Sequence, residues 1–169
     1  MSMKKSLLVL LISNVFIFGT IFSDNQESQK LLTRALANHG VLLFQTLNYH
    51  WNIEGKEFHD YHLLFNKQYN ALFENLDLIA ERIRAVGGKA PSSMKEFLKH
   101  ATLKEDHRVK INPKQMIINL HDQYVKVIND IKQSIKDLEK SDDFGTRKML
   151  EDLVEMHEKT KWMLDSLRK

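Results

Sequence analysis

The chain has 169 residues, which is enough for one domain with a substantial core and too few for two ordinary domains. It contains no cysteine, which excludes disulfides, thiolate nucleophiles and iron–sulfur clusters, so any metal must be held by imidazole, carboxylate, backbone or water. The net charge is +3, but residues 1–23 contribute Lys4 and Lys5 and no acid, so the remaining 23 basic and 22 acidic residues give no DNA-binding footprint.

The first 23 residues differ from the rest of the chain. Met1 to Lys5 is short and basic, and Ser6 to Phe22 is largely apolar. This pattern is typical of a secretory signal, with cleavage after Gly19 or Ser23, and would imply export. An uncleaved membrane anchor and an apolar extension are the two other interpretations, although 17 interrupted apolar residues are short for spanning a bilayer. We therefore divide the chain into residues 1–23, a signal peptide or apolar N-terminal extension, and a folded domain over residues 24–169.

Apolar residues at steps of three and four predict two long helices in the first half of the domain. The first runs from about Ser28 to Ile53 and is ended by Gly55, and its apolar face includes His39 and His50. The second runs from about residue 59 to residue 86 and is ended by two glycines. Because His39 shares the face of His50, we expect it to be a hydrogen-bonded interface histidine.

A connection of about 25 residues follows, and Ser93 with Glu96 has the spacing of a capping box, which predicts one short helix over residues 94–100. Such a connection is too long for a hairpin, so it should carry the chain along the bundle and start the third helix at the same end as the second. Asn112 followed by Pro113 predicts that start. A fourth helix, running to about Leu167, follows the turn at residues 141–143. The sequence therefore predicts an all-α four-helix bundle with a long crossover between helices two and three.

Candidate metal ligands are concentrated between Tyr49 and Glu81. His50 and His62 lie at helix edges near the Gly55 turn, and Asp77 and Glu81 are four residues apart on the second helix, where their carboxylates are neighbours. At about 100° per residue, the two acids lie about 60° and 100° from His62, at the edge of the apolar face. Such a pair of acids is usually a solvated surface feature, but at this edge it faces a seam or a neighbouring subunit.

The sequence also excludes one kind of metal site. Di-iron centres inside four-helix bundles use Glu-x-x-His motifs, and no histidine in this chain has Glu or Asp three residues before it. The simplest assembly that joins two imidazoles and two carboxylates is a twofold interface to which each chain contributes half of each site.

The spacing of these residues resembles the DNA-protection-during-starvation (Dps) family of mini-ferritins over roughly residues 28 to 169. The resemblance is carried by a small set of residues and motifs: Tyr49-His50-Trp51-Asn52, Gly55, His62, Asp77 and Glu81 within ENLDLIAERI, Gly87-Gly88, and Trp162 in the last helix. It implies a ferritin-like fold and a ferroxidase that oxidises Fe(II), preferably with hydrogen peroxide. By the same resemblance, His50 and His62 of one chain and Asp77 and Glu81 of its twofold partner bind iron, and Trp51 lies beside it.

The resemblance further implies a dodecamer built from twofold dimers, which forms a hollow shell that stores ferric iron and protects against oxidative stress. The chain departs from the family at Asn66, where many members have an acid that supports the site, and at the N-terminus, where DNA-binding members often carry a lysine-rich tail. Two other functions stay open: a DNA-condensing stress protein, which the charge does not support, and an exported shell acting as an interaction protein. The cytoplasm or nucleoid is the family's usual location, whereas the leader suggests export.

Overall fold

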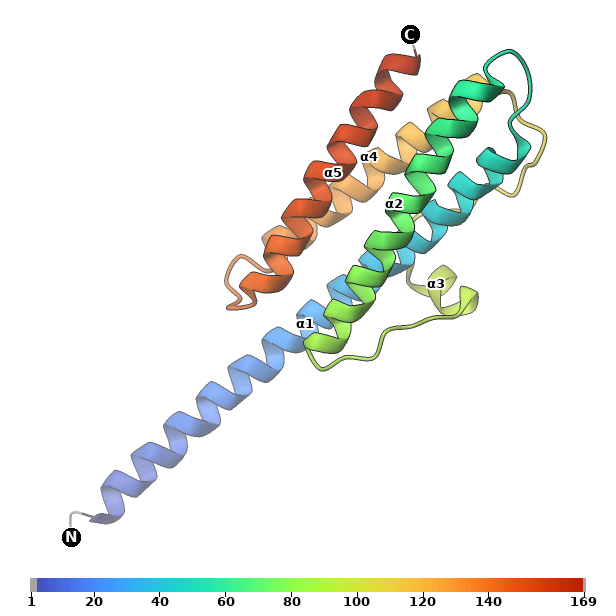
Figure 1. Cartoon of the computed structure of the whole chain (residues 1–169). Helices are drawn as coiled ribbons and strands as arrows, with labels where there is room; N and C mark the ends of the chain where they lie inside the picture. Colours follow the sequence, from blue (N-terminus) through green and yellow to red (C-terminus); the bar gives the residue numbers. More distant parts are fainter. Residues whose placement is uncertain (1–2, 169) are drawn as a thin grey trace.

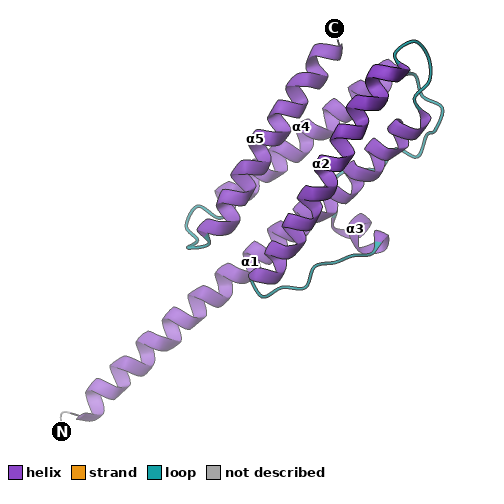
Figure 2. Cartoon of the chain, in the orientation of Figure 1, coloured by secondary structure: helices purple, strands orange, loops and turns teal. Residues whose placement is uncertain are grey.

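The computed structural model describes the backbone of residues 3–168 and the side chains of residues 25–168. Within these residues the fold is entirely helical (Figure 2). The elements are α1 (Met3–Asn52), α2 (Phe58–Ala85), α3 (Met94–His100), α4 (Pro113–Asp137) and α5 (Phe144–Arg168). The predicted fold class, an all-α bundle with a short helix in the crossover, is therefore confirmed.

Helix α1 differs from its predicted bounds at one end. It begins at Met3 instead of near Ser28 and extends well past the end of the bundle (Figure 1). The sequence between these points contains no proline and only one glycine, so nothing in it stops a helix that begins upstream. The predicted signal peptide or anchor lies outside the residues whose side chains are described. Among those that are described, no helix is both long and apolar enough to cross a membrane.

The bundle is built from two antiparallel helix pairs, α1 with α2 and α4 with α5, which lie side by side (Figure 1). The apolar stripes predicted from the sequence form the core between them. Leu32 and Leu36 of α1, Phe65 and Ile79 of α2, and Leu120 of α4 are all fully buried. At about 25 cal/mol per Å² of apolar surface removed from water, this burial is the main force holding the pairs together.

Both predicted helix caps are present. The Ser93 side chain accepts a hydrogen bond from the amide of Glu96 at 3.2 Å, and the Asn112 side chain accepts one from the amide of Gln115 at 2.8 Å. Each cap satisfies one amide that has no partner within its helix, which typically contributes about 1 kcal/mol. The starts of α3 and α4 are thus fixed by local sequence.

The crossover is fastened to α1 at two points. Phe97 of α3 packs over Gly40, and the Asn38 side chain accepts hydrogen bonds from the amides of Thr102 and Leu103 at 2.8 and 3.1 Å. The chain then runs along the bundle, so that α4 begins at the end where α2 begins, as predicted (Figure 1). The crossover therefore lies along α1 as far as the C-terminal end of that helix, where the candidate site is.

Candidate functional site

The turn between α1 and α2 brings the two predicted histidines together. Gly55 adopts φ +104°, a left-handed conformation that a side chain would strain, and it reverses the chain within five residues. His50, near the end of α1, and His62, near the start of α2, consequently face each other. Their rings stack with centroids 3.9 Å apart and planes 25° apart.

Each of these rings is hydrogen-bonded to the backbone of the other residue. Nδ1 of His50 lies 3.0 Å from the carbonyl oxygen of His62, and Nδ1 of His62 lies 3.0 Å from the carbonyl oxygen of His50. A carbonyl can only accept, so both Nδ1 atoms carry a proton, and Nε2 is the ring nitrogen left to bind a metal. Backbone carbonyls bonded in this way fix the tautomer and orientation that a metal-binding imidazole needs.

Aromatic residues hold the pair of imidazoles from both sides. Phe58 stacks on His62 with centroids 4.9 Å apart, and the Tyr69 ring meets His50 edge-on at 5.1 Å. Asn66 donates from Nδ2 to the Tyr69 hydroxyl at 2.7 Å. Asn66 is therefore connected to His50 through the Tyr69 ring. His50 is 8% exposed, whereas the neighbouring Trp51 is 67% exposed, so the site opens towards the protein surface.

The predicted carboxylates lie elsewhere on the same chain. Asp77 and Glu81 are exposed on α2 and have no hydrogen bond or ion pair among the described residues. Asp77 is 15 residues beyond His62 on a straight helix, so the two are roughly 22 Å apart along the axis at 1.5 Å per residue. No cluster of three or more metal-ligating side chains forms within the described part of the chain. One chain thus brings His50 and His62 together and leaves Asp77 and Glu81 without a partner among the described residues.

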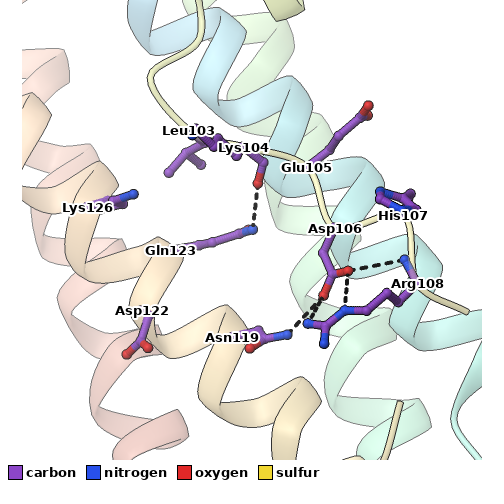
Figure 3. A pocket seen from close by; sticks show the side chains of 10 residues that line it. All are labelled: Leu103, Lys104, Glu105, Asp106, His107, Arg108, Asn119, Asp122, Gln123 and Lys126. Atoms are coloured by element: carbon purple, nitrogen blue, oxygen red, sulfur yellow. Dashed lines mark hydrogen bonds and ion pairs between the residues drawn. The ribbon is translucent and has the colours of Figure 1, made fainter. Parts of the chain in front are cut away.

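A polar cluster that the sequence did not indicate fixes the crossover beside the histidines. Asp106 accepts hydrogen bonds from both Nε and Nη2 of Arg108 at 2.7 Å and from Nδ2 of Asn119 at 3.0 Å (Figure 3). It also accepts one from the Tyr49 hydroxyl at 3.1 Å. The bonds from Arg108 lower the pKa of Asp106 to about 2, and burial raises the pKa of Tyr49 to about 12. Tyr49 immediately precedes His50, so this cluster anchors the end of α1.

The same crossover borders an open cavity of about 570 Å³ between residues 103–108 and the outer face of α4. The mixed charges of residues 104–110 are typical of a solvated loop. Asp106 is instead half-buried, and its carboxylate accepts hydrogen bonds from three surrounding side chains, so part of this run is anchored to the bundle. A run of alternating charges gives no sign of such an anchor.

Comparisons with known proteins identify the family of this fold. The family model described as a ferritin-like domain matches residues 29–169. A low temperature-induced protein of Nostoc sp. is 37% identical over 149 residues, covering 88% of this chain and 83% of the relative. General stress protein 20U of Bacillus subtilis is 31% identical over 140 residues, covering 83% and 96%. The crystal structure of a Dps protein from Vibrio cholerae, titled a member of a superfamily of ferritin-like diiron-carboxylate proteins, has a TM-score of 0.83 and 30% identity, covering 87% and 92%.

Proposed function

The chain belongs to the Dps family of ferritin-like proteins, and from this membership we propose that it is an iron-sequestering ferroxidase. It oxidises Fe(II), preferably with hydrogen peroxide, at a site shared between two subunits. The ferric product is stored inside a hollow homo-oligomer, a dodecamer built from twofold dimers, and this removal of iron and peroxide protects against oxidative stress. Iron is therefore both the substrate that is oxidised and the product that is stored.

The observation that carries the proposal is the reciprocal bonding of His50 and His62. It leaves the Nε2 atoms of two stacked rings without a hydrogen-bond partner among the described residues. Imidazole is a good ligand for Fe(II), while carboxylate oxygens favour the harder Fe(III). A site that combines the two therefore lowers the free energy of the oxidised state relative to the reduced state.

The outer face of α2 supports the assignment of Asp77 and Glu81 to the partner subunit. If His62 of one chain meets these acids of the other, the two α2 helices run antiparallel and the twofold axis crosses them near residues 70–72. The positions that would then face the partner recur at steps of three and four, in an order that reads the same from either end. They are His59, His62, Asn66, Asn70, Phe73, Asp77, Glu81 and Arg84. Phe73, 64% exposed in the single chain, would be covered near the axis.

The reaction balances with peroxide as the oxidant. Two Fe(II) ions each give up one electron, and one hydrogen peroxide takes both electrons and two protons to become two molecules of water. Because both electrons arrive together, no hydroxyl radical is released. The chain's own contribution is to hold the imidazoles in the metal-binding tautomer and, from the partner, to supply carboxylates that have no competing ion pair.

Substitution of Asp77 tests the proposal. Asp77→Ala should abolish rapid oxidation when anaerobically added Fe(II) is followed by peroxide, and it should leave the helical circular dichroism unchanged. Glu74→Ala is the matched control, because Glu74 is equally exposed on α2 and lies outside the proposed ligand set. Equal oxidation rates in Asp77→Ala and the unaltered protein would refute the assignment. A native mass that showed a monomer binding iron tightly would refute the shared site.

A further inference from the structure

Two histidines that the proposed iron site does not use are bonded to each other inside the bundle. His39 of α1 is 0% exposed and His157 of α5 is 2% exposed, and their Nε2 atoms lie 2.9 Å apart. Nδ1 of His39 lies 2.7 Å from the carbonyl oxygen of Ala35 and must donate to it, so Nε2 of His39 is an acceptor. His157 therefore donates from Nε2. Both rings are neutral, and a single proton lies in the hydrogen bond between their two Nε2 atoms.

The pair connects the two halves of the bundle, because α1 packs with α2 and α5 packs with α4. Its interior surroundings offer no counter-charge for a second proton. No carboxylate among the described residues is bonded to either ring. Burial lowers the pKa of His39 to about 4 and the pKa of His157 well below its ordinary value, and the neighbouring His39 lowers the latter further.

No charged side chain of the described residues on the surrounding helices is bonded to either ring. The ring of Tyr124, on α4, contacts His157 with centroids 5.4 Å apart and stays a neutral phenol because burial raises its pKa. The buried stripe of α2 carries only amides as polar groups. Several polar side chains on these helices have partners of their own: Arg34 bonds to Ser134, Glu158 to Lys132, and His121 to Asp122 and Asp165.

We propose that the His39–His157 pair is an acid-sensitive latch, whose protonation releases α5 from α1 and opens the bundle. An added proton must be held in an apolar interior without a partner, whereas in the opened chain it is hydrated. The opened state therefore binds more protons than the closed state as the pH falls from 6.5 towards 4, and stability is lost across that window. This latch does not depend on the proposed ferroxidase activity.

The pH dependence of unfolding tests the latch. With an opened-state pKa of 6.5 and a closed-state pKa of about 4, His39 alone should raise the unfolding equilibrium constant about 20-fold between pH 7 and pH 5. Urea denaturation of the full chain at one fixed protein concentration measures this increase. The double variant His39→Leu/His157→Leu should lack it, whereas His107→Leu, at an exposed loop position, should keep it. The same increase in the double variant and the unaltered protein would overturn the proposal.

Two measurements on the unaltered chain keep the proposal testable if the double variant fails to fold. Amide hydrogen exchange in α5 should accelerate at pH 5 relative to pH 7 beyond the intrinsic change in exchange rate. Nitrogen-15 NMR of labelled histidine should show both buried rings neutral in the folded protein at pH 5.5. Imidazolium signals from this pair in folded protein at pH 6, with α5 exchange unchanged, would overturn it.

Discussion

Gly40→Ala tests how tightly the crossover is fastened to α1. A Cβ at this position would lie 2.5 Å from Cδ2, 2.8 Å from Cε2 and 3.2 Å from Cγ of Phe97, which is itself buried. Overpacking of this kind costs about 1–3 kcal/mol, and the better helix propensity of alanine offsets about 1 kcal/mol of it. The net expectation is a loss of about 1 kcal/mol in the free energy of unfolding, measured by urea denaturation.

The sign of the effect should reverse when the ring is removed. In a Phe97→Ala background the methyl group at position 40 meets no ring, so Gly40→Ala should stabilise the protein by about 1 kcal/mol through helix propensity alone. Comparison of the unaltered protein, Gly40→Ala, Phe97→Ala and the double variant therefore separates a steric clash from a general tolerance of alanine. If Gly40→Ala changes the unfolding free energy by the same amount in both backgrounds, the contact between α3 and α1 is not the cause.

Two further predictions concern residues beside the histidines. Asn66→Asp places a carboxylate beside Tyr69 and should raise the number of Fe(II) ions bound tightly per subunit in an anaerobic titration. An unchanged stoichiometry would show that position 66 does not limit iron binding. Tyr49→Phe removes a hydroxyl that donates to Asp106 and accepts from Asn119, and should lower the free energy of unfolding by about 1 kcal/mol in urea denaturation. An unaltered midpoint and slope would mean that the cluster around Asp106 does not stabilise the crossover.

The bundle could be predicted from the sequence because its signals are local. Apolar spacing predicted the two long helices of the first half, and Ser93 and Asn112 marked two helix starts within one residue. The start of α1 could not be predicted this way. Residues 3–27 contain no strong helix breaker, and a change from apolar to polar composition at Asp24 does not end a helix.

The candidate site could be predicted only in part, because its geometry combines local and distant contacts. Spacing on either side of Gly55 predicted that His50 and His62 meet, but their reciprocal bonds to backbone carbonyls depend on the conformation of the turn. His39 was expected at an interface and is instead bonded to His157 in the interior. These two residues are 118 positions apart, and periodicity within one helix cannot show which helix lies opposite.

Asp77 and Glu81 lie far from His62 along α2, and this distance decides where they can act. Both were predicted to lie at a helix edge facing a seam or a neighbour, and both are exposed. The rise of an α-helix keeps them too far from His62 to share an ion with it in one chain. Their assignment to the partner subunit stays a prediction, and it is the central claim about this protein.

Subunit complementation tests that claim most directly. One chain carries His50→Ala and His62→Ala, the other carries Asp77→Ala and Glu81→Ala, and each should be inactive in peroxide-dependent Fe(II) oxidation when assembled alone. In a shared site, random co-assembly in equal amounts should restore about one quarter of the unaltered activity, because about one quarter of the sites receive both intact halves. Co-assembled oligomers, verified by native mass, that stay as inactive as their parents would contradict a site shared across the twofold interface.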